Sequence, residues 1–242
     1  MISRRLLRIK VIKALYAHLK SESDSLAASE KNLVASIDKT YDLYFHLLSL
    51  ITEVARYAEE RQETAKRKKL PTFEDLNPNR KFVDNAVVAL LSHSDAVNDY
   101  NASHKLSWAR FPELIKTLFE QLERSDYYKK YMASSEHSFR EDLSLVVDFY
   151  SNELEESEML EDVLDEESIL WNDDLGFVLA MVIRTLSGIR QSHRDVKVMP
   201  EFKNPDDLLF AKELFAKAEI QAKEKYQRLL ELSKPWPTHK QA

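Results

Sequence analysis

Apolar side chains recur at alternating steps of three and four along residues 30–66, which is the spacing of one continuous face of an α-helix. The face consists of Leu33, Ile37, Tyr41, Tyr44, Leu48, Ile51, Ala55 and Ala58. Glycine, which turn-rich β structure needs, occurs only as Gly176 and Gly188. We therefore predict an all-α fold made of helical bundles, in which this long helix packs against partners.

The same periodicity predicts further helices along the rest of the chain. They are expected at residues 81–92, 111–123 and 139–154, after Asp173 and Asp174, and after the Asn204–Pro205 pair. Pro71 and Pro78 mark a linker behind the long helix. The sequence has no cysteine and no apolar run of about 18 residues. We therefore expect a cytoplasmic protein without disulfides, thiolate metal sites or membrane-spanning segments.

The first twenty residues carry six Lys or Arg side chains and no acidic one, although the formal net charge of the whole chain is −6. A helix would place Leu6, Ile9, Lys13 and Tyr16 along one stripe and several of the cations elsewhere. Three interpretations compete: a solvated face of a core helix, a surface that binds nucleic-acid phosphates, and, least favoured, an organelle-targeting segment.

Two motifs bear on this choice. The first is Arg4-Arg5-x-x-Arg8 followed by Ala14-Leu15-Tyr16, and the second is Asp42-Leu43-Tyr44-Phe45-His46-Leu47-Leu48. In this order they resemble the N-terminal signature of the NusB family of bacterial transcription antitermination factors. The resemblance covers residues 1 to about 60 and about 170 to 236. The layout resembles the long form of the family, which has a large helical insertion between its N-terminal helices and its C-terminal bundle.

The resemblance implies three regions. Residues 1–69 hold the basic helix and the long amphipathic helix, residues 70–169 form the helical insertion with an acidic run at its end, and residues 170–242 hold the C-terminal helices. The Asn-Glu and Phe-x-Asn-Gly motifs of the family's C-terminal half have no counterpart in the sequence. The C-terminal bundle is therefore expected to be truncated.

The resemblance also implies a function. Members of the family bind the boxA element of the ribosomal RNA leader together with a ribosomal protein, NusE, and so regulate transcription termination by RNA polymerase. On this resemblance we expect a non-enzymatic RNA-binding protein of transcription antitermination. The expected RNA-binding residues are Arg4, Arg5, Arg8, Lys10, Lys13 and Tyr16.

Two alternatives stay open. A helical adaptor would bind only protein, with the acidic run between Glu153 and Asp174 as its candidate surface, and would show no affinity for RNA. A membrane-surface segment would bind anionic vesicles through residues 1–20 alone. A second basic cluster, Lys66-Arg67-Lys68-Lys69, is better explained as the C-terminal end of a helix than as an RNA contact.

The sequence gives little support for a catalytic function. The two glycines exclude a Gly-rich phosphate loop, and there is no HExxH or GxSxG motif and no nucleophilic cysteine. The seven histidines are dispersed without a metal-ligand spacing, and the acidic run has no accompanying His or Lys. We therefore expect no catalytic residues, no metal site, no cofactor and no small-molecule substrate.

Overall fold

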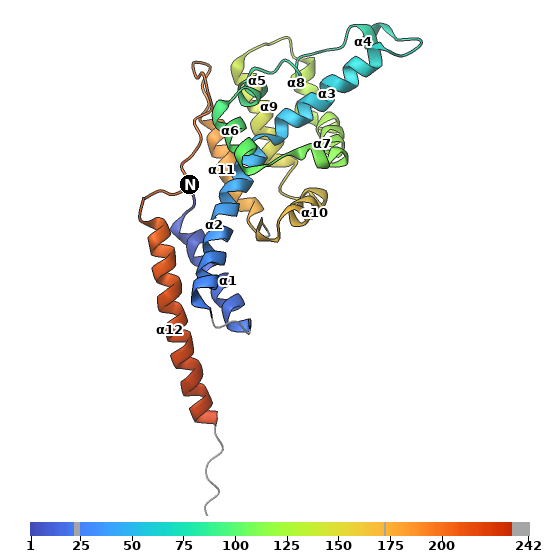
Figure 1. Ribbon diagram of the computed structural model, residues 1–242. Coiled ribbons are helices and arrows are strands. Elements are labelled where there is room, and N and C mark those ends of the chain that lie inside the picture. The colour runs from blue at the N-terminus through green and yellow to red at the C-terminus, as the bar shows by residue number, and fades with distance from the viewer. Residues whose placement is uncertain (22–24, 172, 234–242) are drawn as a thin grey trace, which may run out of the picture. The chain divides into compact units, whose positions relative to one another are not determined.

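A computed structural model describes residues 1–21, 25–171 and 173–233 (Figure 1). Within these ranges the chain consists of helices and their connections, and the extended pairing is limited to an isolated bridge between Ile2 and Phe202. The prediction of an all-α helical fold is confirmed. No helix in the described ranges is long and apolar enough to cross a membrane.

The chain divides into two compact units, which are described separately. The terminal unit comprises the described residues of Met1–Asp38 and Glu201–Ala242, and the central unit comprises those of Lys39–Pro200. Helix α2 (Leu26–Leu48) begins in the first and ends in the second. The three regions implied by the family resemblance do not follow this division and stay a prediction.

The terminal unit is built on two helices from opposite ends of the sequence. Helix α1 (Arg4–Lys20) packs along α12 (Asp207–Ser233), as Figure 1 shows. Ser3 caps α1, because its hydroxyl accepts a hydrogen bond from the Leu6 N–H at 3.3 Å. The backbone N–H of Ile2 also donates to the Glu201 carbonyl at 2.7 Å, which joins the start of α1 to the segment that precedes α12.

The central unit contains a series of shorter helices. In chain order they are α3 (Leu50–Lys66), α4 (Phe73–Leu76), α5 (Ala86–Ser92), α6 (Asp95–His104), α7 (Pro112–Arg124), α8 (Asp126–Ala133), α9 (Phe139–Asn152), α10 (Glu158–Glu167) and α11 (Leu175–Ser187), with 3-10 turns at Trp108–Arg110 and Ile169–Trp171. Helix α3 packs against α5 and α7, and α9 packs against α5, α8 and α11. Their buried faces meet in one continuous apolar core.

Most of the helices predicted from periodicity are present, with one late start. The helix expected over residues 81–92 begins only at Ala86. Asn85 is the reason, because its side-chain carbonyl accepts hydrogen bonds from the N–H groups of Val87 and Val88 and so caps the helix there. Apolar side chains recur at helical spacing on both sides of Asn85, so their spacing alone does not predict where the helix begins.

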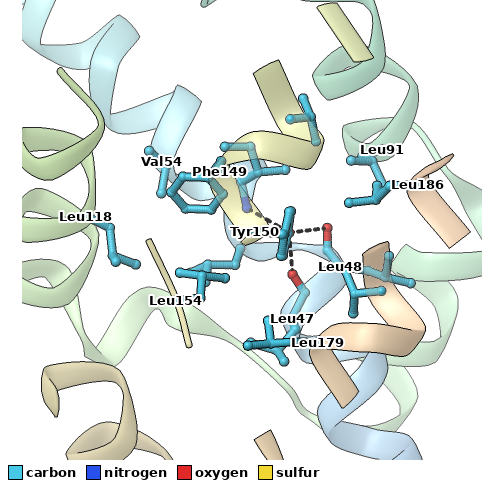
Figure 2. Packing of buried hydrophobic residues seen from close by; sticks show 14 of the residues in the cluster. Leu47, Leu48, Val54, Leu91, Leu118, Phe149, Tyr150, Leu154, Leu179 and Leu186 are labelled. Atoms are coloured by element: carbon cyan, nitrogen blue, oxygen red, sulfur yellow. Dashed lines mark hydrogen bonds between the residues drawn. The ribbon is translucent and has the colours of Figure 1, made fainter. Parts of the chain in front are cut away.

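The long helix expected over residues 30–66 is interrupted at Ser49, where α2 ends and α3 begins. The interruption coincides with the buried hydroxyl of Tyr150 on α9 (Figure 2). This hydroxyl donates to the Leu47 carbonyl at 2.5 Å and accepts from the Ile51 N–H at 3.4 Å. In an uninterrupted helix that N–H and that carbonyl would bond each other, so the hydroxyl is inserted into the helical ladder.

Trp108 also contacts the break between α2 and α3 at Ser49, which we name the joint. The His46 carbonyl accepts from the indole N–H of Trp108 at 2.9 Å and from the Ser49 hydroxyl at 2.8 Å. The His46 ring is fully buried and stacks on the Trp108 ring with centroids 3.7 Å apart. The Trp171 ring lies 5.6 Å from it. Neither nitrogen of the His46 ring has a hydrogen-bond partner among the described residues, and burial lowers its pKa to about 3.

Replacing Tyr150 with phenylalanine tests the inserted hydroxyl. We expect Tyr150→Phe to lower the free energy of unfolding by about 1–3 kcal/mol, because the buried Leu47 carbonyl loses its donor. Urea unfolding followed by circular dichroism measures the change. The matched control is Tyr57→Phe, since the Tyr57 hydroxyl has no hydrogen-bond partner among the described residues. Equal stabilities of the two variants would contradict the inserted hydroxyl.

The buried His46 predicts a pH dependence of stability. The unfolded chain takes up a proton at His46 below about pH 6.5, whereas the folded chain does so only near pH 3. As the pH is lowered from about 6.5 to about 3, the free energy of unfolding should therefore decrease, by up to about 1.4 kcal/mol per pH unit. His46→Phe keeps a flat ring and should remove this slope in urea unfolding at a series of pH values. The exposed control His137→Phe should keep it, and an unchanged slope in His46→Phe would contradict the prediction.

Candidate nucleic-acid interface

Helix α1 has a buried face and an exposed face, and they are not those expected from the sequence. The buried side chains are Leu6, Leu7, Lys10, Val11 and His18. Of the expected packing stripe, Ile9 and Tyr16 are instead 41% and 64% exposed. The face predicted to be buried was wrong by about one residue, which corresponds to 100° of rotation about the helix axis. The face that carries Leu7 and Val11 is buried instead, because α1 packs against α12.

Arg4 and Arg8 lie over the aromatic ring of Phe210 on α12. Their guanidinium carbons are 4.8 and 5.5 Å from the ring centroid. Arg4 also donates through Nε to the Asp207 carboxylate at 2.8 Å. The Arg4 guanidinium holds the pKa of Asp207 below its usual range. The Arg4 side chain is 48% exposed but forms an ion pair with Asp207 of α12. Arg8 forms no ion pair with any described residue.

The exposed face of α1 combines cations with an aromatic ring. Arg5, Arg8, Lys13 and Lys20 are all exposed, and Arg5 and Arg8 form no ion pair with any described residue. The Lys20 ammonium lies 5.5 Å from the centroid of the Tyr16 ring. At 100° per residue, Arg5 and Tyr16 fall at the centre of this face and the other cations flank it. We name these five residues the α1 face.

Lys10 does not belong to this surface. Its side chain is only 4% exposed and lies on the buried side of α1. His18 is also buried, with Nδ1 hydrogen-bonded to the Ser29 hydroxyl at 2.8 Å and Nε2 3.7 Å from the Glu219 carboxylate. The structure thus gathers Arg5, Arg8, Lys13 and Tyr16 on one surface, keeps Arg4 at its edge and separates Lys10 from it.

Three large apolar side chains accompany the cations. Ile9, Ile12 and Leu19 are 41%, 65% and 51% exposed, and with Tyr16 they follow the steps of three, four and three that mark one helix face. The step pattern is visible in the sequence. The sequence interpretation placed Ile9 on the expected stripe and assigned Ile12 and Leu19 neither to the core nor to a site.

Two residues that shape the α1 face were not foreseen. Asp207 and Phe210 anchor Arg4 and position Arg8, yet they lie about two hundred residues away in the sequence. No local pattern connects them with the N-terminus. The acidic pair Asp206-Asp207 at the start of α12 is typical of a helix N-terminus and by itself indicates no contact with Arg4.

Asp207→Ala tests how far the α1 face depends on α12. The Asp207 carboxylate is buried and accepts from both Arg4 and the Asn204 N–H. We expect its loss to lower the free energy of unfolding by about 1–3 kcal/mol and to accelerate amide hydrogen exchange in the first turns of α1. The exposed neighbour Asp206→Ala is the control. Equal exchange in both variants would contradict the anchoring role.

Comparisons with known proteins add no assignment. No protein-family model matches this sequence, and neither a curated protein nor a solved structure matches it significantly. The resemblance to the NusB family therefore rests on the two N-terminal motifs and stays a prediction.

Proposed function

We propose that this chain is a non-enzymatic RNA-binding protein that holds single-stranded RNA on the α1 face. The observation that carries the proposal is the exposure of four cations around the exposed ring of Tyr16 on one helix. In a chain of net charge −6, this concentration of positive charge is local, as binding to a polyanion requires.

Each part of the α1 face has a role in this proposal. Arg5, Arg8 and Lys13 contact backbone phosphates, and their positive charge releases counterions from the RNA. Tyr16 offers a ring on which one base stacks, which single strands allow and duplexes do not. Arg4 contributes a weaker contact, because Asp207 already neutralises much of its charge.

The biological role is proposed from the two motifs. Under the resemblance to the NusB family, the RNA is a boxA-type ribosomal RNA leader, the protein partner is the ribosomal protein NusE, and the outcome is antitermination by RNA polymerase. The Arg4-Arg5-x-x-Arg8 motif supplies two of the four cations that surround Tyr16, namely Arg5 and Arg8. This agreement between the motif and the exposed cations supports the proposal.

A protein adaptor is the second candidate. The observation that favours it is the exposed apolar stripe of Ile9, Ile12, Tyr16 and Leu19, since contiguous apolar patches often mark protein interaction sites. Ile12 and Leu19 have no ring to stack on a base, so they are better suited to a protein partner than to RNA. The two candidates share Tyr16 but otherwise use different residues of the same helix, the cations for RNA and Ile9, Ile12 and Leu19 for a protein, so they can be separated by mutation.

The test is a fluorescence-anisotropy titration of a boxA-type RNA with the full chain, with and without NusE, at several salt concentrations. We expect salt-sensitive binding that NusE tightens. The variant Arg5→Gln/Arg8→Gln/Lys13→Gln should weaken binding and reduce the slope of log K against log salt by about two units, because about 0.7 unit is lost per phosphate contact on a single strand.

Two control variants make this test specific. Lys116→Gln/Arg124→Gln/Lys129→Gln removes the same charge from exposed cations of α7 and α8, and should leave binding to RNA nearly unchanged. Ile12→Ser/Leu19→Ser keeps every cation of α1 and should also retain RNA binding. Absence of RNA binding at low salt by the folded wild-type chain would overturn the proposal and favour the adaptor.

A further inference from the structure

The second basic cluster lies in the central unit, where α3 ends. Lys66 occupies the last turn of α3, Arg67 is its C-cap, and Lys68 and Lys69 follow. Lys66 pairs with Glu63 at 2.6 Å and Lys68 pairs with Asp75 at 2.9 Å. Arg67 and Lys69 are exposed and form no ion pair with any described residue.

Three large apolar side chains directly follow these cations. Leu70 is 90% exposed, Phe73 is 80% exposed and Leu76 is 53% exposed. They recur at steps of three around α4, which lies at the end of α3 (Figure 1). We name residues 66–77 the α4 tip. Single exposed apolar residues are common on protein surfaces, but three within seven positions beside four cations form a patch that needs a partner.

The α4 tip has a defined conformation. Thr72 and Asp75 form a reciprocal capping box, in which the Thr72 hydroxyl accepts from the Asp75 N–H at 3.1 Å and the Asp75 carboxylate accepts from the Thr72 N–H at 3.0 Å. The Phe73 carbonyl accepts from both the backbone N–H and the side-chain amide of Asn77. These bonds fix the turn that displays Phe73, so its exposure is part of the structure of the turn.

The exposed apolar side chains of the α4 tip do not line the hollow beside it. A hollow of about 590 Å³ lies between the tip and helices α7 and α8. It is lined by Glu74 and Asp75 of the tip and by Pro78 and Asn79, which follow the tip, whereas Leu70, Phe73 and Leu76 take no part in the lining. The tip therefore separates its acidic side chains, on the inner side, from its apolar ones.

We propose that the α4 tip docks on an anionic lipid surface. Leu70, Phe73 and Leu76 enter the boundary between headgroups and acyl chains, and Arg67 and Lys69 contact the lipid phosphates. Charge complementarity supports this occupant, since four consecutive cations border the apolar side chains. Such peripheral docking needs no membrane-spanning helix.

Shape and chemistry favour lipid over a macromolecule at this place. A stable protein interface buries roughly 800 Å² on each partner, and one helical turn with three protruding side chains offers far less. Phe73 has a ring on which a base of RNA could stack, but Leu70 and Leu76, the other two apolar side chains of the patch, have none. A lipid surface is fluid and accepts protruding side chains without a preformed groove. The proposal stands independently of RNA binding by the α1 face.

Site-specific fluorescence tests the insertion, because the sequence has no cysteine and a single one can be introduced and labelled. Leu76→Cys with an environment-sensitive NBD label reports on the tip, and Glu113→Cys, at the first turn of α7, is the control site. With vesicles of phosphatidylcholine and phosphatidylglycerol, the tip label should shift to shorter wavelength and the control label should not. A shift of the tip label with poly(U) RNA but not with vesicles would overturn the proposal.

Vesicle sedimentation of the full chain identifies the responsible residues. We expect Leu70→Ser/Phe73→Ser to lower the partition coefficient by about tenfold or more, and Arg67→Gln/Lys69→Gln to lower it to a similar extent only when phosphatidylglycerol is present. Ile12→Ser/Leu19→Ser is the matched control in α1 and should bind vesicles as the wild type does. Failure of the wild-type chain to sediment with anionic vesicles, or loss of binding in the α1 control alone, would overturn the proposal.

Discussion

The insertion of the Tyr150 hydroxyl between Leu47 and Ile51 determines where α2 ends and α3 begins. Because α3 contacts α4, α5 and α7, the course of α3 after this joint sets the positions of these helices. The joint is buried, so every backbone group freed there needs a partner from the surrounding elements. Tyr150 and Trp108 supply those partners, and the packing of α9 and of the loop before α7 is thereby coupled to the course of the long helix.

The buried His46 is held in its neutral form, whereas the cations of α1 are exposed. The His46 ring stacks on two tryptophans, its nitrogens have no hydrogen-bond partner in the described part of the chain, and burial lowers its pKa to about 3. The terminal unit instead displays the cations of the α1 face at its surface, and Arg4, at the edge of this face, is neutralised by the buried Asp207 carboxylate. Acid is thus expected to destabilise the central unit through one buried histidine, while salt modulates binding at the exposed cations.

Two surfaces join cations to exposed apolar side chains, and their shapes suggest different partners. The α1 face runs along about four turns of helix and centres on Tyr16, which fits the extended strand of RNA that we propose as its ligand. The α4 tip is a single turn that displays Leu70, Phe73 and Leu76, which fits a fluid interface. The α1 face lies in the terminal unit and the α4 tip in the central unit.

The sequence by itself determined the all-α class, the approximate limits of most helices and the concentration of cations in α1, because these follow from periodicity, scarce glycine and local charge. Only the tertiary structure decided which face of α1 is buried. A helix with apolar residues on several sides can pack in more than one rotation, and contact with α12 selected Leu7 and Val11 and left Ile12 and Tyr16 exposed. Tertiary structure also placed Lys10 inside, brought Asp207 to Arg4 and divided the long seam at Ser49, since each depends on residues distant in the sequence.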